Sequence, residues 1–233
     1  MHLYAGTSGF SYKEWKGSFY PEDLPVKEML RYYSSHLPAV EINNTFYRLP
    51  QRTTLEGWKD QVPENFRFSV KASQRITHFK RLKDVENETK YLLETAGALG
   101  DQLGVVLFQL PPNMKKDLDR LEQFLKLLPR KINAAFEFRH PAWFDNDVLE
   151  LLRAESRTLC VSDTDDLPAN QIDRTADWGY LRLRRVSYSE NDLAEWIRKI
   201  NAQHWQSVYV FFKHEDEATG PKLAAQFLEL SKT

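Results

Sequence analysis

Cysteine is almost missing from this 233-residue chain, in which Cys160 is the single example. One cysteine cannot form an intramolecular disulfide, so the sequence excludes a disulfide-stabilised scaffold and fits a reducing compartment. Cys160 lies inside the apolar run 158–161. We therefore interpret it as a small core residue rather than a nucleophile.

Long hydrophobic runs and an excess of one charge are missing as well. No apolar stretch approaches the roughly 20 residues that a membrane-spanning helix needs, and residues 1–6 do not look like the start of a signal peptide. Lys and Arg total 32 against 33 Asp and Glu, a net charge of −1, so no overall field attracts membranes or nucleic acid nonspecifically. These absences predict a cytoplasmic protein with no membrane partner, and they leave its oligomeric state undetermined.

Cofactor motifs are a third absence. Residues 6–9 contain two of the nine glycines but lack the G-x-G-x-x-G spacing of a dinucleotide-binding turn. No H-x-x-x-H or C-x-x-C spacing marks a metal site. We predict no cofactor, and a metal is the less favoured alternative because nearby lysine and arginine would repel a cation. Its ligands would come from Glu41, Glu137, His140, Asp163 and His214.

What the chain does contain is a regular alternation of strand-like and helix-like segments. Eight short apolar runs, several with a polar or charged end, lie at residues 3–7, 40–43, 66–71, 105–109, 134–137, 159–163, 180–184 and 208–213. Segments with helical periodicity lie at residues 25–37, 84–99, 116–128, 146–155, 189–200 and 221–230. Thr53 and Glu56 have the spacing of a capping box and predict a further helix.

Strands with apolar bodies and polar ends are typical of parallel barrels, whose functional side chains gather at the C-terminal ends of the strands. The segment 164–178 is polar and offers at most a short helix. We predict a single α/β domain over residues 1–233, a TIM-type (β/α)8 barrel with a weak or missing helix between strands 6 and 7. A doubly wound open sheet is the alternative.

Such a barrel would bring polar side chains from most strands to one rim. A charged side chain at the end of a buried strand must be paired or solvated, because the desolvation of a lone charge is costly. We expect Glu41, Lys71, Glu137, Arg139 and Arg182 to converge around one solvent-filled hollow. For each of them, an ion network that only stabilises the fold is the alternative.

Four of the rim residues are catalytic candidates. Two carboxylates in one pocket can have their pKa values pushed apart, so Glu41 and Glu137 form a candidate acid–base pair. Lys71 follows apolar residues and is either a Schiff-base nucleophile or, in our preferred interpretation, a cation that binds phosphate or carboxylate. His140 could transfer protons near neutral pH. Salt bridges from the glutamates to Lys71 or Arg139 are the structural alternative.

The remaining candidates would bind the substrate, which we expect to be a small anion. Arg139 suits bidentate contact with an oxyanion. Arg182 and Arg184 share one face of the seventh predicted strand, near the place where barrel enzymes often bind phosphate, unless they neutralise Asp163 and Glu137 instead. The substrate-binding candidates are Asn43, Tyr47, Gln109, Arg139, Asp163, Arg182 and Arg184.

Several spaced motifs resemble those of the YecE-like family, a bacterial and archaeal domain of unknown function. They include GTSGF (6–10), VEIN (40–43), TFY (45–47), VKA (70–72), ITH (76–78), QLPP (109–112) and EFRH (137–140). The resemblance runs from residue 4 to the last predicted helix and implies a TIM-type barrel and an intracellular location, with no known activity. The chain departs from the family pattern at Arg184-Arg185, often His-Gly, and at Lys213-His214, often a pair of Asn. Both departures make the rim more cationic.

Three functions fit these observations. The first is an enzyme that uses acid–base chemistry, of the hydrolase, lyase or isomerase type, on a small phosphorylated or carboxylated substrate. The second is a barrel that binds or processes nucleic acid, because basic and aromatic residues alternate in the segments 46–48 and 78–81. The third is a non-catalytic scaffold whose rim is a stabilising network.

Overall fold

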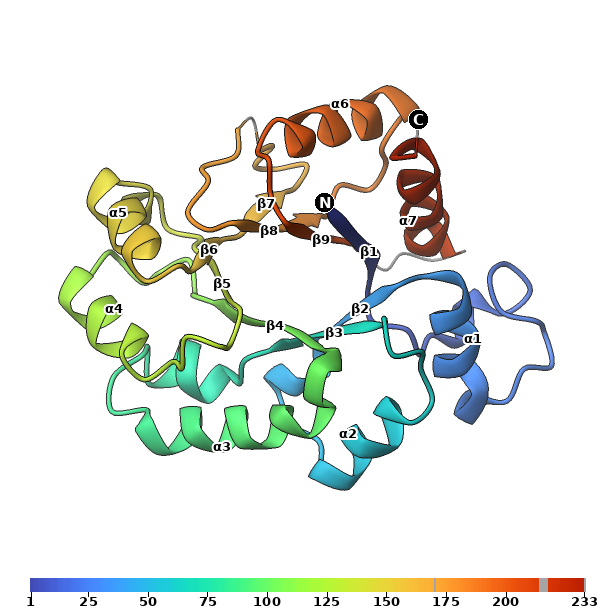
Figure 1. Cartoon of the computed structure of the whole chain (residues 1–233), viewed down its shortest axis with the longest axis horizontal. Helices are drawn as coiled ribbons and strands as arrows, with labels where there is room; N and C mark the ends of the chain where they lie inside the picture. The colour runs from blue at the N-terminus through green and yellow to red at the C-terminus, as the bar shows by residue number, and fades with distance from the viewer. Residues whose placement is uncertain (170, 214–217, 233) are drawn as a thin grey trace.

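The computed structural model describes residues 1–169, 171–213 and 218–232. In this part of the chain, nine parallel strands form one sheet that curves into a barrel, with the helices on its outside (Figure 1). The strands are β1 (His2–Ser8), β2 (Ala39–Ile42), β3 (Arg67–Lys71), β4 (Leu103–Gln109), β5 (Ala134–Glu137), β6 (Thr158–Leu159), β7 (Val161–Asp163), β8 (Trp178–Leu183) and β9 (Ser207–Phe212). Every strand pair is parallel, as the alternation of strands and helices predicts.

The sheet is nearly closed by a single short segment of chain. Its strand order is β6-β5-β4-β3-β2-β1-β9-β8-β7, so the two end strands are neighbours in sequence. β6 pairs with β5, β7 pairs with β8, and Cys160 between them donates its backbone N–H to Phe136 at 2.8 Å. The sixth predicted strand is therefore divided into two, each half serving one neighbour. The predicted TIM-type barrel is confirmed.

Helices fill the connections between strands, except that Cys160 alone joins β6 to β7 and a loop joins β7 to β8. They are α1 (Met29–His36), α2 (Arg52–Lys59), α3 (Glu86–Ala96), α4 (Leu118–Leu125), α5 (Asn146–Ala154), α6 (Glu190–Asn201) and α7 (Thr219–Leu230). Between β7 and β8 the described residues form a loop that lies between α5 and α6 in Figure 1. The weak connection predicted for residues 164–178 thus contains no helix in its described part.

The predicted capping box at Thr53 is wrong. Gln51 has the extended backbone of an N-cap, so α2 starts at Arg52 and Thr53 already lies in its first turn. A hydroxyl in the first turn cannot cap the amides that follow it, because an N-cap residue must stand outside the helix. A complete capping box occurs instead at α6, where Ser189 and Asp192 bond each other's backbone N–H.

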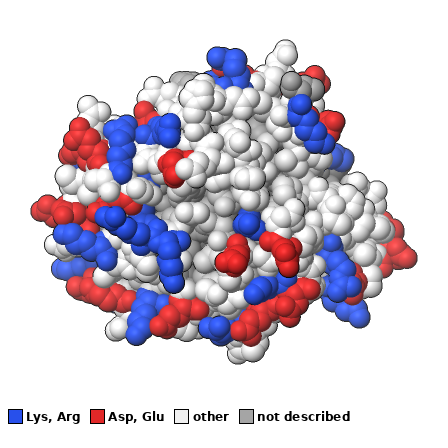
Figure 2. Space-filling model, viewed as in Figure 1, with Lys and Arg blue, Asp and Glu red and all other residues white. Residues whose placement is uncertain are grey.

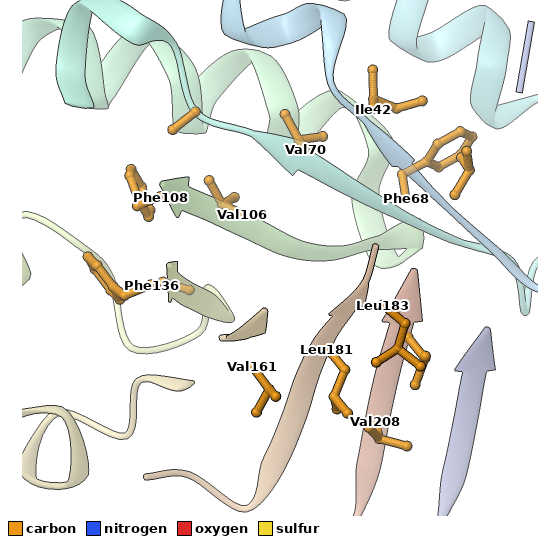
Figure 3. Packing of buried hydrophobic residues seen from close by; sticks show 14 of the residues in the cluster. Ile42, Phe68, Val70, Val106, Phe108, Phe136, Val161, Leu181, Leu183 and Val208 are labelled. Atoms are coloured by element: carbon orange, nitrogen blue, oxygen red, sulfur yellow. The ribbon is translucent and has the colours of Figure 1, made fainter. Parts of the chain in front are cut away.

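Apolar side chains pack on both faces of the sheet, as expected when both faces are buried. The outer face packs against the helices, and Figure 3 labels ten of the residues in this layer, among them Val70, Phe108 and Val161. Alternate residues of the same strands point into the barrel and fill the part of its interior that lies towards the N-terminal ends of the strands. This interior cluster contains Ala39, Val105, Leu107, Ala135, Cys160, Trp178, Tyr180, Tyr209 and Phe211. Cys160 is thus the core residue that the sequence predicts.

Candidate functional site

Above the apolar interior, towards the C-terminal ends of the strands, lies a buried polar cluster built around Arg182. Its guanidinium donates from Nη2 to Glu41 Oε1 at 2.9 Å and from Nη1 to Glu137 Oε2 at 2.5 Å. Glu41 is 0 % exposed, and Glu137 and Arg182 are each 1 % exposed. One cation on β8 therefore bridges carboxylates on β2 and β5, across the interior of the barrel.

Neighbouring side chains occupy the remaining acceptor positions of the two carboxylates. Glu41 accepts from Ser8 Oγ at 2.7 Å, Tyr180 Oη at 2.6 Å and Asn43 Nδ2 at 3.0 Å. Glu137 accepts from Gln109 Nε2 at 2.9 Å and Arg139 Nε at 3.1 Å. We call Ser8, Glu41, Gln109, Glu137, Tyr180 and Arg182 the paired layer.

Both carboxyl groups of the paired layer are ionised. Burial by itself raises a carboxyl pKa, but the Arg182 charge and the hydrogen bonds outweigh it. The pKa of Glu41 is lowered, and the pKa of Glu137 is lowered to about 2. A pair that divides acid and base roles needs pKa values that move apart. The acid–base pair expected from the sequence is therefore not formed, because one guanidinium holds both groups as carboxylates.

Lys71 lies at the end of β3, beside the paired layer. Its Nζ donates to Gln109 Oε1 at 2.9 Å and lies 4.3 Å from the centre of the Phe46 ring. Burial, and then the charge of Arg182, lower the pKa of Lys71 to about 8. The alternative of a salt bridge from the glutamates to Lys71 or Arg139 is therefore met by Arg139, which pairs with Glu137, whereas the hydrogen-bond acceptor of Lys71 is an amide.

Two arginines complete the polar end of the barrel. Arg139 bonds Glu137 from one side and keeps 40 % of its side chain exposed. Arg184 is half-buried, and its Nε is buried without a hydrogen-bond partner. Among the residues that the structure describes, nothing pairs with its guanidinium, and its pKa is lowered by burial and then by the charge of Arg182. We call Lys71, Arg139 and Arg184 the cationic rim.

Among the residues that the structure describes, the site carries more positive than negative charge. Its cations are Arg182 and the three members of the cationic rim, and the carboxylates that these cations bond there are those of Glu41 and Glu137. Arg182 forms ion pairs with both carboxylates through Nη1 and Nη2, so within the described residues the excess positive charge belongs to the rim. An anion that reached the rim would meet partly desolvated cations, where electrostatic attraction is stronger than in bulk water.

His78 is a site residue that we did not predict. It follows β3 in the π-helix η4 (Arg75–Phe79), and such π-helical turns are frequent at functional sites. Its Nδ1 lies 2.9 Å from Thr77 Oγ1, and its ring packs edge-on to Phe46 at 4.8 Å. Burial, then the charges of Lys71 and Arg139, lower its pKa. The motif ITH (76–78) was the available signal for this residue.

Asp163 does not join the other candidates. Ser162 of β7 lies on the same strand face as Cys160, which fills the interior, so Asp163 points to the outer face of the sheet. There it accepts hydrogen bonds from Arg185 Nη2 at 3.2 Å and from Tyr188 Oη at 2.9 Å, and it forms a salt bridge with Arg185. The alternative in which Asp163 is neutralised by Arg182 or Arg184 is therefore wrong, since Arg185 takes that role.

Two more candidates are His140, which makes a hydrogen bond within its own loop, and Tyr47, which faces the solvent. His140 Nδ1 accepts the backbone N–H of Ala142 at 3.1 Å and so caps the 3-10 turn η6 (Pro141–Trp143). Tyr47 is 73 % exposed and contacts the edge of Phe46. Asn43 and Gln109, by contrast, lie where predicted, because each bonds a carboxylate of the paired layer.

A cavity of about 760 Å³ opens beside the cationic rim, between the end of β5, the divided strand β6–β7 and the loop that follows it. Glu137 and Arg139 contribute to its wall, so it is continuous with the site. Its other lining residues are Pro112, Phe138, Phe144, Leu159, Cys160, Val161, Ser162, Thr164, Asp166, Leu167, Pro168, Ala169, Gln171 and Asp173.

Within the described ranges, no three His, Cys, Asp or Glu side chains gather closely enough to hold a metal ion. His214 lies outside the described residues. It was one of the ligands in the metal alternative and is also the second residue of the Lys213-His214 departure. A helix long and apolar enough to cross a membrane is likewise not found among the described residues.

The geometry defines a class of protein: a parallel α/β barrel with a polar site at the C-terminal ends of its strands. A family model described as "Protein of unknown function DUF72" matches residues 4–233, and the chain belongs to this family. The predicted resemblance to the YecE-like family is confirmed, since a relative of the chain is the UPF0759 protein YecE.

Relatives and solved structures agree with this assignment. UPF0759 protein YunF of Bacillus subtilis is 24% identical over 227 residues, which is 92% of this chain and 79% of that protein. YecE of Escherichia coli K12 is 32% identical over 116 residues, 49% of this chain and 43% of that protein. A DUF72 family protein from Thermotoga maritima has a TM-score of 0.83 at 27% identity, covering 100% of both chains. One from Enterococcus faecalis shares the fold, with a TM-score of 0.80 at 18% identity over 99% of this chain and 96% of that one.

Proposed function

We propose that this protein is an enzyme that binds a small organic anion at the cationic rim and catalyses proton transfer to and from that anion. The observation that carries the proposal is a cationic rim in which Lys71 donates to an amide, Arg139 is ion-paired but 40 % exposed, and Arg184 has no partner among the described residues. A half-buried guanidinium without a partner is costly for the protein alone. A phosphate or carboxylate bound there would offset that cost.

The arginines are suited to bind the anion. A guanidinium presents a planar set of donors that matches the oxygens of phosphate and carboxylate. Arg184 has its guanidinium unpaired among the described residues, and Arg139 uses its Nε on Glu137 while 40 % of its side chain stays exposed. Glu137 thereby acts as a positioning residue for Arg139 and takes no part in the proton transfer itself.

Lys71 and His78 are suited to move the proton. Both contact the ring of Phe46, so they lie on the same side of the site. Lys71, with a pKa of about 8, is mostly protonated at pH 7 and can donate, whereas the lowered pKa of His78 keeps it neutral and able to accept. These two groups replace the glutamates in the acid and base roles.

Nucleic-acid binding is the less favoured function. On the face drawn in Figure 2, Lys and Arg are interspersed with Asp and Glu rather than gathered into a basic surface. Proteins that track a nucleic-acid backbone present a continuous basic patch or groove.

The test is a thermal-shift screen of the protein against sulfate, methyl phosphate, acetate, sugar phosphates, neutral sugars and a single-stranded oligonucleotide. We expect the small anions to raise Tm and the neutral sugars to leave it unchanged. Arg184→Gln should weaken anion affinity about tenfold, because it removes one charge-assisted contact. The exposed control Arg130→Gln should behave like the unmodified protein.

Catalysis is tested on the phosphorylated or carboxylated compounds that bind. Lys71→Met and His78→Gln should each lower turnover by about 100-fold or more, the usual contribution of a general acid or base. Equal anion response in Arg184→Gln and Arg130→Gln, or no response to any anion, would contradict the proposal. Salt-sensitive binding of the oligonucleotide alone would instead favour the nucleic-acid function.

A further inference from the structure

We infer that the anion this site accepts carries an apolar group, and that the apolar group lies in the cavity beside Arg139. This inference rests on the proposed function and specifies its substrate class. The cavity is continuous with the cationic rim, because Arg139 and the Glu137 that holds it both contribute to its wall. A ligand with its charge at the rim therefore has space beside it for the rest of the molecule.

The wall of the cavity is mainly apolar away from Arg139. It is made by Phe138, Phe144, Leu159, Val161, Leu167 and Pro168. A volume of about 760 Å³ lies in the range of small-molecule sites, which are mostly apolar with a few polar groups that fix the ligand's orientation. A phosphate or sugar alone would leave this apolar surface in contact with water, whereas an aromatic or branched hydrocarbon group would cover it.

The cavity exists because the barrel lacks a helix at this position. Strand residues such as Leu159 and Val161 belong to the outer layer that helices cover elsewhere in the barrel. After β7, however, the described residues form a loop, of which Ala169 and Ile172 pack against this layer while Leu167 and Pro168 are exposed and line the cavity. The missing helix thus converts part of the outer core into a wall that a ligand can reach.

The polar part of the wall restricts the ligand further. Besides Glu137, the cavity is lined by the carboxylates of Asp166 and Asp173. A second anionic group would meet these aspartates and be repelled. The favoured ligand therefore has one anionic group, at the rim, and an uncharged apolar body.

Matched pairs of probes test the inference in solution. Isothermal titration with methyl phosphate against phenyl phosphate, and with acetate against 3-phenylpropanoate, separates the contribution of the ring from that of the charge. We expect the ring to tighten binding about tenfold or more within each pair, from the apolar surface that it removes from water. The pair with the tighter binding shows whether phosphate or carboxylate is the preferred head group.

Variants locate the effect. Phe144→Ala and Leu167→Ala remove exposed parts of the wall, 48 % and 67 % accessible, and should leave the fold intact. Each should reduce the advantage of the ringed probe severalfold while methyl phosphate and acetate bind as before. Phe79→Ala, 71 % accessible and outside the cavity, is the control and should change neither.

The outcomes distinguish a failure of this inference from a failure of the proposed function on which it rests. If ringed and ringless probes bind equally, or if the ring's advantage survives both Phe144→Ala and Leu167→Ala, the inference is overturned while anion binding stands. If none of the four probes binds, the proposed function itself fails.

Discussion

The paired layer and the cationic rim lie next to each other in one barrel and treat charge in opposite ways. In the paired layer, each ionised group of Glu41, Glu137 and Arg182 meets an opposite charge, and all three are excluded from water. In the cationic rim, Lys71 meets an amide and Arg184 meets no described partner. The same strands therefore carry charges that stabilise the fold and charges that are available to a ligand.

The comparison is sharpest along β8 and its extension. Arg182 and Arg184 are two residues apart on the same strand face, so they differ in depth rather than in direction. A guanidinium in the interior of a barrel must be neutralised there, and Arg182 is. Two residues further along, the Arg184 side chain is half-buried and has no ion-pair partner among the described residues. Depth along the barrel axis therefore separates a guanidinium that is ion-paired from one that no described residue pairs with.

The largest effect is expected from Arg182→Met. This change leaves Glu41 and Glu137 buried without their shared cation, and loss of one partner of a buried ion pair typically costs about 3–5 kcal/mol. The free energy of unfolding, measured by urea denaturation at pH 7, should fall by about that amount. Arg184→Met is the matched control and should change it by less than about 0.5 kcal/mol, in either direction. Equal losses in the two variants would show that the layers do not differ.

A smaller effect is expected from acid. The pKa of Glu137 is lowered from 4.5 to about 2 in the folded protein, so its carboxylate stabilises the fold above pH 4.5. That contribution, roughly 3 kcal/mol, is lost as the pH falls from about 5 to 2, because the unfolded chain binds the proton first.

The control for the acid effect is Glu137→Gln, which cannot take up this proton. Urea denaturation at a series of pH values should give a shallower acid limb for Glu137→Gln than for the unmodified protein. If the two slopes agree, Glu137 is not the group that Arg182 holds ionised.

The smallest effect is expected at the rim, in alkali. With a pKa of about 8, Lys71 loses its proton between pH 7 and pH 10, and with it one charged contact to an anion. Sulfate affinity should therefore fall about tenfold over this range, measured by isothermal titration, since sulfate keeps its own charge. Lys71→Arg, which stays protonated, should bind sulfate with little dependence on pH. A similar fall in both proteins would place the titrating group elsewhere.

Much of the fold could be predicted because it depends on local patterns. Apolar runs with polar ends indicated the strands of the barrel and placed Glu41 and Glu137 at their C-terminal ends, where the structure has them. The expected convergence of Glu41, Lys71, Glu137, Arg139 and Arg182 is largely confirmed, since Arg182 bonds both glutamates, Glu137 bonds Arg139, and Gln109 links Glu137 to Lys71. The solvent-filled hollow expected at their centre is wrong for Glu41, Glu137 and Arg182, because these three side chains are buried and bond one another directly.

The remaining errors concern information that a pattern does not contain. Asp163 ends a three-residue strand in which Ser162 alternates with Val161 and Asp163, and so short a strand does not show which face is interior. His78 lies in a π-helical turn whose position depends on packing against Phe46, contributed by another loop. The unpaired state of Arg184 depends on which residues fail to reach it, and this is visible only in three dimensions.

The division of the sixth predicted strand into β6 and β7 also determines where the sheet opens most easily. β6 has two residues and β7 has three, whereas β9 on the far side of β8 has six. Short hydrogen-bonded ladders open with the least free energy, so the cylinder has a weak seam along residues 158–163. Local opening of these two short strands would widen the cavity beside them while the longer strands keep their pairing. A larger ligand would then fit without unfolding of the barrel.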